Sequence, residues 1–343
     1  MKLKLAINGF GRIGRSFLRA SVIDKEFLNM IEITAINDIG NLETLSHLLK
    51  YDSTFGKFNG DIKIDSRNKL LIVNDIAIKI FSENNIDKLP WKNLGIDVVL
   101  ESTGKFTNAV DAQKHLKAGA KKVVITAPSK NADITMILGI NDNMYKKSKH
   151  NIISMASCTT NSLAPVVKVI NDKFGIENVY MTTTHAYTND QKLLDSYHKD
   201  LRRSRSASMS IIPTSTGAAK SIGYVIPELN GKIDGLALRV PVNNGSIADI
   251  VFTVKKEVSK EEVNQVLKQA SETNLNGILS YTEEPIVSSD IIGDNHSSIV
   301  DGLSTMVLGG KSKNIKILSW YDNEWGFACR IVDILKFIYK NTY

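Results

Sequence analysis

The chain has few cysteines and prolines, and it has no long apolar run. Of its 343 residues, two are cysteine and seven are proline. Cys158 and Cys329 are too far apart for a CxxC motif, and no Cys/His cluster has zinc spacing, so neither a disulfide framework nor a metal site is expected. No apolar stretch reaches the roughly 18–20 residues that span a bilayer. The composition therefore favours an ordinary globular protein over a membrane-spanning or disulfide-stabilised one.

An excess of positive charge is present, but it is scattered. Lys and Arg number 43 against 36 Asp and Glu, a net charge of +7. The one dense basic run covers residues 199–205. A dispersed excess is typical of a solvated surface that attracts anionic metabolites, so nucleic acid is not expected as the primary partner. The opening apolar stretch is short and is interrupted by glycine and arginine, unlike a signal peptide. A cytoplasmic location is expected.

The pattern of apolar residues changes near the middle of the chain. Strands alternate with helices over 1–157, which predicts a doubly wound parallel sheet. Later segments such as 236–241 and 247–254 alternate as antiparallel strands do. We therefore expect an α/β fold of two domains. A Rossmann dinucleotide-binding domain over 1–157 would be completed by a C-terminal helix within 324–343. An α+β catalytic domain with a mainly antiparallel sheet would span 158–323.

A glycine motif near the start has the context of a dinucleotide-binding fingerprint. Gly9, Gly11 and Gly14 follow an apolar strand and open a helix that is predicted to end near Met30. Gly9 permits a tight turn, Gly11 lets the backbone approach a pyrophosphate, and Gly14 allows the helix to pack closely on the strand. Asp38 ends the next strand, where it would accept hydrogen bonds from the ribose hydroxyls. The sequence thus predicts an NAD(P) site at a helix N-terminus.

A cysteine with catalytic context follows the first domain. Cys158 lies between an apolar strand at 152–155 and an apolar helix predicted to begin near Ser162. A helix N-terminus stabilises a thiolate, which predicts a lowered pKa for this thiol. His185 ends the next strand and is the candidate base for activating the thiol. A cysteine with no such context is more often a packing residue, which is the expectation for Cys329.

These motifs belong to longer segments that resemble the glyceraldehyde-3-phosphate dehydrogenase family from end to end, in the family's order and spacing. The matching segments are AINGFGRIGR, HLLKYDSTFG, ESTGKFT, ASCTTNSLAP, HAYTNDQ, DLRRSR, IIPTSTGAAK, VIPELNGK, RVP and WYDNEWG. The resemblance implies a phosphorylating, NAD(P)-dependent aldehyde dehydrogenase of glycolysis and gluconeogenesis. Its substrate would be D-glyceraldehyde 3-phosphate, its product 1,3-bisphosphoglycerate, and its usual assembly a homotetramer.

The resemblance also implies a role for each site residue. Cys158 would attack the aldehyde, and His185 would take the hydroxyl proton as a thioester forms, which inorganic phosphate then cleaves. The substrate's own phosphate would bind Thr188 and Arg239. The attacking phosphate would bind Ser157, Thr159, Arg203, Thr216 and Gly217. On the cofactor side, the family places Arg12 and Ile13 at the pyrophosphate, Thr103 and Thr126 near the nicotinamide half, Asn323 on the carboxamide and Phe327 beside the nicotinamide.

Two alternative functions remain open. Tyr197-His198 resembles erythrose-4-phosphate dehydrogenase, which shares the fold and the nucleophile. Against it, the segment from Thr214 to Lys220 keeps the donors for inorganic phosphate, which a hydrolysing relative does not need. The second alternative is an RNA- or protein-binding role, which would leave the Cys/His/Arg set unexplained.

The sequence gives opposing signals on the preference between NAD and NADP. Asp38 favours NAD, because a carboxylate repels the 2′-phosphate of NADP. Ser196 and Tyr197 stand where strictly NAD-using relatives often have Leu-Pro, and this leaves NADP open as a second cofactor.

Overall fold

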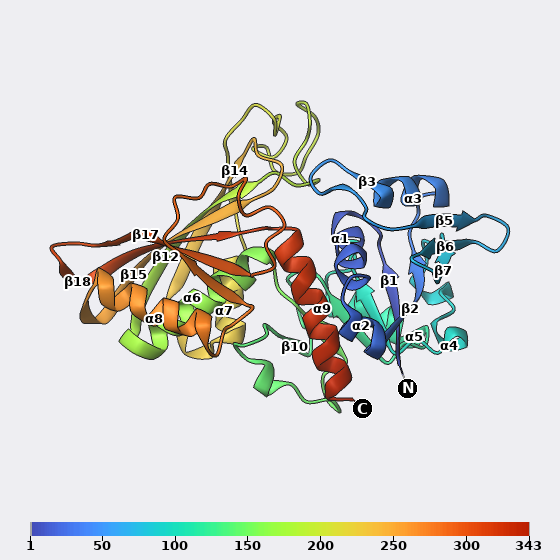
Figure 1. Cartoon of the computed structure of the whole chain (residues 1–343), viewed down its shortest axis with the longest axis horizontal. Coiled ribbons are helices and arrows are strands. Elements are labelled where there is room, and N and C mark those ends of the chain that lie inside the picture. Colours follow the sequence, from blue (N-terminus) through green and yellow to red (C-terminus); the bar gives the residue numbers. More distant parts are fainter. Residues whose placement is uncertain (1, 343) are drawn as a thin grey trace. The chain divides into compact units, whose positions relative to one another are not determined.

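The computed structural model describes residues 2–342, which fall into two compact units (Figure 1). Unit 1 comprises residues 2–136, 143–156 and 328–342, and unit 2 comprises 137–142 and 157–327. Each unit is built around one large sheet. Within residues 2–342, each helix is too short or too polar to cross a membrane.

The sheet of unit 1 is mostly parallel. Its strands are β1 (Leu3–Asn8), β2 (Ile31–Asn37), β5 (Ile62–Asp65), β6 (Leu70–Val73), β7 (Ile76–Phe81), β8 (Val98–Glu101), β9 (Lys122–Ile125), β10 (Ile134–Thr135) and β11 (Ile152–Ser154). They are ordered β10-β11-β9-β8-β1-β2-β7-β6-β5. The strands from β10 to β7 run parallel, and β7, β6 and β5 form an antiparallel edge. All residues of β8 and β9 are buried, as expected for parallel strands covered on both faces. The predicted Rossmann architecture is confirmed.

Several helices belong to or border unit 1. They are α1 (Arg12–Ser21), α2 (Lys25–Met30), α3 (Leu42–Lys50), α4 (Trp91–Leu94), α5 (Ala109–Lys117) and most of α9 (Trp325–Lys340), with 3₁₀ turns η1 (Ile86–Lys88) and η2 (Asp142–Met144) and a short hairpin of β3 (Tyr51–Asp52) and β4 (Gly56–Lys57). The single helix predicted to end near Met30 is in fact two, so that prediction was wrong. Asp24 accepts a hydrogen bond from Phe27 N at 2.9 Å and so caps a second helix.

The sheet of unit 2 is mainly antiparallel, as predicted. Its strands are β12 (Ile176–Ala186), β13 (Ile212–Ser215), β14 (Ile233–Val240), β15 (Ser246–Ser259), β16 (Leu279–Thr282), β17 (Ser298–Val307) and β18 (Lys311–Tyr321). Their order is β13-β14-β12-β15-β18-β17-β16. Among the described strands of this sheet, only β12 with β14 and β16 with β17 pair in parallel. The β12–β14 pair proves important for the site.

One face of the unit 2 sheet is covered by helices. Figure 1 shows α6 (Cys158–Phe174), α7 (Ala218–Val225) and α8 (Lys260–Glu272) together on that face, and a 3₁₀ turn, η3 (Pro227–Leu229), follows α7. Leu163 and Ile170 of α6 join the same buried cluster as Ile250 and Phe252 of β15. This packing fixes α6, and with it the first turn that carries Cys158.

Candidate active site

The glycine motif of unit 1 lines a cavity of about 210 Å³ at the carboxyl ends of β1, β2 and β8. The lining residues are Asn8, Gly9, Gly11, Asn37, Asp38, Ile39, Glu83, Asn84, Ile86, Ser102, Thr103, Lys105 and Phe106. In open α/β sheets, ligands bind at this edge. The cavity is therefore the candidate cofactor site.

Two of the motif glycines, Gly9 and Gly14, are required by close backbone contacts, and the third, Gly11, faces open space. Gly9 has φ +95°, and a Cβ there would lie 2.6 Å from Thr103 N. A Cβ on Gly14 would lie 2.4 Å from Gly9 O, so only glycine lets α1 approach β1 this closely. At Gly11, a Cβ would meet no heavy atom of the described chain within 4 Å. α1 starts there without a side-chain cap from any described residue. These features fit the pyrophosphate of a dinucleotide at the helix N-terminus.

The carboxylate of Asp38 is held in place by the backbone. Its Oδ2 accepts from Phe10 N at 2.7 Å, and its Oδ1 accepts from Gly40 N at 2.8 Å. A carboxylate has about four acceptor positions, so two remain for ribose hydroxyls. The ribose contact itself stays a prediction.

A buried polar network beneath the cavity was missed in the sequence. Trp91 Nε1 donates to His115 Nδ1 at 3.0 Å, and His115 Nε2 lies 3.0 Å from Glu101 Oε2. Because indole N–H only donates, Nδ1 must accept, and a neutral imidazole then carries its proton on Nε2, facing Glu101. Glu101 also accepts from Asn8 Nδ2 at 2.6 Å and from Thr103 N at 2.9 Å. The network therefore holds Thr103, a predicted cofactor residue, in position. Glu101 lies in the ESTGKFT segment, whereas His115 and Trp91 carry no local signal.

The Trp91–His115 hydrogen bond should contribute measurably to stability. Trp91→Phe leaves His115 Nδ1 buried without its donor, which should lower the free energy of unfolding by about 1–3 kcal/mol. The smaller ring also leaves a gap, so the double variant Trp91→Phe/His115→Phe serves as the control. Urea unfolding of the wild type, both single variants and the double variant should show a coupling of about 1 kcal/mol. Strictly additive losses would show that the bond contributes nothing.

The remaining predicted cofactor residues of unit 1 have partners within that unit. The Arg12 guanidinium donates to Asp52 and lies 5.8 Å from the centre of the Phe55 ring. Ile13 is half-buried in the first turn of α1. Thr126 Oγ1 donates to Glu101 O at 3.1 Å. Asp52 and Phe55 belong to the HLLKYDSTFG segment but were not singled out.

Asn323 lies in unit 2 just before α9, and Phe327 lies in the first turn of that helix. Asn323 Oδ1 accepts from Ser246 Oγ at 2.9 Å and from Gly245 N at 3.2 Å. These contacts fix the amide plane, so that a carboxamide partner would meet its other end. Phe327 is 4% exposed.

The structure brings the predicted thiol and imidazole together within unit 2. Cys158 is the first residue of α6, and His185 lies near the end of β12, with Sγ and Nε2 3.5 Å apart. The helix begins earlier than the predicted start near Ser162, because Ser157 Oγ accepts from Thr160 N at 3.1 Å and caps it. Cys158 is thus in the first turn of the helix itself.

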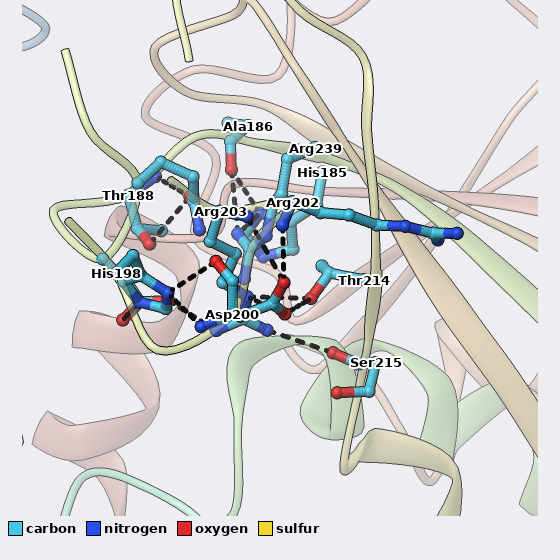
Figure 2. A network of polar contacts seen from close by, with 12 residues as sticks. His185, Ala186, Thr188, His198, Asp200, Arg202, Arg203, Thr214, Ser215 and Arg239 are labelled. Atoms are coloured by element: carbon cyan, nitrogen blue, oxygen red, sulfur yellow. Dashed lines mark hydrogen bonds and ion pairs between the residues drawn. The ribbon is translucent and has the colours of Figure 1, made fainter. Parts of the chain in front are cut away.

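The guanidinium of Arg239 completes this cluster. The parallel pairing of β12 and β14 aligns His185 with Arg239 (Figure 2). Arg239 Nη1 lies 2.6 Å from His185 Nδ1 and donates to Ala186 O at 2.9 Å. His185 Nδ1 also lies 2.7 Å from Ala186 O.

Tyr321 of β18 is a further residue that sequence reasoning missed, although it lies in the WYDNEWG segment. Its ring packs edge-on against His185 with centroids 5.9 Å apart. Its hydroxyl bonds to Thr159 Oγ1 at 2.9 Å and to Thr183 Oγ1 at 2.8 Å. Tyr321 therefore joins the first turn of α6 to β12 and holds the cysteine and histidine in register.

The electrostatics of the pair differ from the expectation. Burial, helped by the charge of Arg239, lowers the pKa of His185 to about 3. Burial raises the pKa of the Cys158 thiol, although Arg239 and hydrogen bonds from Thr159 act in the other direction. The predicted lowering of this pKa is wrong, because desolvation of the thiolate outweighs the charge of Arg239 and the hydrogen bonds at the helix start.

Two of the predicted phosphate-binding residues belong to the same polar network as Arg239 (Figure 2). Arg203 donates to Asp190, to Thr214 Oγ1 at 2.8 Å and to Ser215 O at 3.3 Å. Thr188 N donates to Gln191 Oε1 at 2.8 Å, and the Thr188 hydroxyl donates to the same oxygen at 3.2 Å. The supporting residues Asp190, Gln191 and Thr214 were not predicted individually.

The other predicted phosphate-binding residues stand at two helix N-termini. Ser157 caps α6, and Gly217 is the N-cap residue of α7, while Thr216 Oγ1 accepts from Ala218 N at 3.2 Å. α6 and α7 pack together, so two helix N-termini belong to one region of unit 2. The structure does not present the Thr159 hydroxyl to solvent: the residue is 4% exposed and bonds to Tyr321. Only the backbone N–H of Thr159 would then remain to bind an anion.

No metal site competes with this interpretation. Among residues 2–342, no group of three or more His, Cys, Asp or Glu side chains could hold an ion.

A dinucleotide-binding unit together with a cluster of a half-buried thiol, a buried imidazole and a half-buried guanidinium defines a dehydrogenase that uses a cysteine nucleophile. Comparison with known proteins specifies the family. The NAD binding domain of glyceraldehyde 3-phosphate dehydrogenase matches residues 3–109, and the C-terminal domain of the same family matches residues 157–323. The chain belongs to the glyceraldehyde-3-phosphate dehydrogenase family.

Individual relatives resemble the chain over its whole length. It is 51% identical over 338 residues to the glyceraldehyde-3-phosphate dehydrogenase of Geobacillus stearothermophilus, covering 98% of both chains. Identity to the Borreliella burgdorferi protein of that name is 54% over 347 residues, covering 98% of this chain and 100% of the relative. Glyceraldehyde-3-phosphate dehydrogenase 1 of Bacillus subtilis is 51% identical over 340 residues, covering 99% of both.

Proposed function

We propose that the chain oxidises D-glyceraldehyde 3-phosphate with NAD and inorganic phosphate to 1,3-bisphosphoglycerate, a reaction of glycolysis and gluconeogenesis. The observation that carries the proposal is the contiguous set Cys158–His185–Arg239. Its thiol and imidazole are 3.5 Å apart, and its imidazole and guanidinium are 2.6 Å apart. Full-length relatives at about half identity carry the corresponding name.

Each residue of the cluster has a chemical task in this reaction. Cys158 Sγ bonds to the aldehyde carbon, and His185 Nε2 takes the resulting hydroxyl proton as the carbonyl re-forms in a thioester. NAD, when bound, accepts the hydride that the aldehyde carbon loses. Arg239 and Thr188 hold the phosphate of the substrate. Arg203 and the backbone at the starts of α6 and α7 hold the inorganic phosphate that cleaves the thioester.

A division of labour between two domains is part of the proposal. Residues 1–157, with the helix within 324–343, would bind the cofactor, and residues 158–323 would carry the chemistry. Support comes from the cavity and glycine geometry of unit 1 and from the cluster of unit 2.

A homotetramer in the cytoplasm is part of the proposal. Apolar side chains of the 186–211 loop are highly exposed, with Leu193 at 77%, Leu201 at 83% and Met209 at 85%. On the β-sheet, Tyr180 and Val251 are also exposed. Apolar surface of this kind marks protein–protein contacts. The family resemblance suggests that other copies of the same chain cover this surface in a tetramer.

The basic loop gives less support to a nucleic-acid role. Arg203 pairs with Asp190, and Arg205 pairs with Asp195 at 2.9 Å. Carboxylates thus neutralise two of the loop's three arginines, which reduces the positive charge that could attract RNA phosphates. A gel shift at physiological salt, with and without NAD, tests this alternative. Tight binding that ignores NAD, together with no oxidation of aldehyde, would favour the binding role.

The proposed activity is tested by initial rates with glyceraldehyde 3-phosphate and erythrose 4-phosphate, with NAD and NADP, with and without inorganic phosphate. We expect a higher kcat/KM for glyceraldehyde 3-phosphate and multiple turnovers only when phosphate is present. Preference for erythrose 4-phosphate, with turnover that does not depend on phosphate, would assign the hydrolysing alternative instead.

Asp38 should set the preference for NAD over NADP. Asp38→Gly removes the carboxylate from the expected ribose site. Two unit charges about 4 Å apart interact by about 4 kcal/mol at an effective dielectric near 20. Solvent and salt reduce this repulsion to about 1–3 kcal/mol. The ratio of kcat/KM for NADP to kcat/KM for NAD should therefore rise roughly 5–150-fold.

The matched control is Asp38→Asn, which removes the charge and keeps an oxygen acceptor for Phe10 N or Gly40 N. Both variants should shift the ratio in the same direction. An unchanged ratio in both would show that Asp38 does not face the ribose.

A further inference from the structure

A chain of buried polar side chains crosses the sheet of unit 1 beneath the cofactor cavity. Its members are Asn37, Asn8 and Glu101, the last residues of the neighbouring strands β2, β1 and β8. The parallel register pairs Asn8 with Asn37 on one side and with Glu101 on the other, so all three lie at the same level of the sheet. Each is at most 5% exposed. We call these three residues the strand-end chain.

The hydrogen bonds of the strand-end chain run in one direction, which the backbone at Glu83 sets. Asn37 Oδ1 accepts from Glu83 N at 2.9 Å, and Asn37 Nδ2 donates to Glu83 O at the same distance. These two contacts determine which end of the amide is the oxygen. Asn37 Nδ2 also donates to Asn8 Oδ1 at 2.8 Å, so Asn8 Nδ2 is left to donate to Glu101 Oε2 at 2.6 Å.

Glu101 carries this order on to the loop that follows β8. Its Oε2 accepts from Asn8 and from His115 Nε2, which lies 3.0 Å away. Its Oε1 accepts from Thr103 N at 2.9 Å and from the Thr103 hydroxyl. These contacts occupy about all four acceptor positions of a carboxylate. Thr103 Oγ1 in turn accepts from Lys105 N at 3.1 Å, and both loop residues line the cavity.

The two ends of the strand-end chain reach different sides of the cavity. Glu83 follows β7 and Thr103 follows β8, and the strand order β8-β1-β2-β7 puts two strands between them. With neighbouring strands about 4.8 Å apart, the two ends are separated by roughly 14 Å across the sheet. Both Glu83 and Thr103 line the cavity. Asp38, the expected ribose acceptor, lies on the Glu83 side, because its N–H donates to Phe81 O of β7 at 3.0 Å.

We propose that Asn8 and Asn37 are positioning residues for the cofactor: through Glu101 they tie the Glu83 side of the cavity to the Thr103 side, so that both sides bind one dinucleotide as a single rigid surface. This inference rests on the proposed function, which supplies the cofactor, and deepens it. Amides that only satisfied each other would act locally, and changes at the two ends would be independent. A continuous hydrogen-bonded chain makes a change at one end felt at the other.

A double-variant cycle on NADH affinity tests the coupling between the two ends. Thr103→Val removes the hydroxyl that bonds to Glu101, and Asn37→Ser removes the amide that donates to Asn8. Fluorescence titration should show that Thr103→Val alone weakens NADH binding about five- to tenfold, but less than about twofold when Asn37→Ser is already present. The matched control is Ile39→Ala, which changes a cavity-lining residue after β2 that lies outside the strand-end chain. In that background Thr103→Val should cause its full loss.

Cutting the strand-end chain in the middle gives an independent test. Asn8→Leu has a similar volume but no polar side-chain atom. In this background Thr103→Val should cause the same loss of NADH affinity whether or not Asn37 is also replaced. If circular dichroism shows that Asn8→Leu does not fold, Asn8→Ser serves instead, because its short hydroxyl cannot reach both neighbours. Additive losses with Asn8 intact, or coupling that persists after Asn8 is replaced, would overturn the proposal.

Binding and turnover separate this inference from the proposed function. The cycles measure NADH affinity and need no oxidation of substrate. Coupled affinities in a protein that fails to oxidise glyceraldehyde 3-phosphate would support the positioning role and contradict the proposed function. Additive losses in an active enzyme would overturn the positioning role alone.

Discussion

Cys158→Ser is expected to abolish turnover, with residual kcat below about 10⁻⁴ of the wild type. Serine keeps the position at the start of α6 but cannot form the thioester on which the chemistry depends. Its hydroxyl is also a far weaker nucleophile beside a histidine whose pKa is about 3. The measurement is the steady-state rate of NADH formation at saturating substrate and phosphate. Cys329→Ser, which changes the other thiol, is the matched control and should keep its activity.

Alkylation tests the same cysteine without substrate. Iodoacetate should modify Cys158 far faster than Cys329, because the positive charge of Arg239 attracts the anionic reagent to the site. Since burial raises the thiol pKa, the rate should still be climbing at pH values above the usual thiol range near 8.5. Equal labelling of both cysteines in the native protein, followed by mass spectrometry of the peptides, would contradict a specialised role for Cys158.

His185→Asn should slow the hydride-transfer step by about 10²–10⁴-fold, the usual contribution of a positioned general base. Cofactor binding should be retained, since the proposed cavity for NAD is lined by residues of unit 1. Single-turnover kinetics separate the chemical step from product release, and fluorescence titration with NADH reports binding. A wild-type rate in the variant would mean that another group accepts the proton.

The same variant isolates a contribution to stability. A histidine whose folded pKa lies near 3, below its ordinary value of 6.5, binds its proton more readily in the unfolded chain. Between those values the unfolded state holds more protons, so stability falls as pH decreases from about 6.5 toward 3. The loss is at most about 1.4 kcal/mol per pH unit. His185→Asn should lack this component, visible as a shallower decline of the unfolding free energy in the same window.

Local patterns were sufficient to predict several elements. The short apolar runs at 98–101 and 122–125 form buried parallel strands, as the alternation of strands and helices over 1–157 predicts. The helix that opens at Gly11 also occurs as the glycine motif predicts, although it ends earlier than expected. Helix boundaries were less predictable. The starts of α2 and α6 depend on side chains of Asp24 and Ser157 that bond to backbone N–H groups, a geometry that apolar periodicity does not report.

The candidate site was predicted unevenly for a similar reason. Cys158, His185 and the motif glycines lie in segments whose local order signals their chemistry. Glu101, His115 and Tyr321 become visible only in three dimensions, because each bonds or packs against residues far away in the chain. The direction of the Cys158 pKa was mispredicted, since burial depends on what surrounds the thiol and not on its neighbours in sequence.

The sequence by itself determined the family, the two kinds of sheet and the identity of the thiol and imidazole, because these follow from residue type and order. Only the tertiary structure decided how those groups are tuned. The parallel pairing of β12 with β14 places the Arg239 guanidinium against His185 Nδ1, and the core cluster of unit 2 packs against the half-buried Cys158. Proton affinity depends on charge and solvent within a few ångströms. Residues 54 positions apart in the chain, as His185 and Arg239 are, come within that range only through the fold.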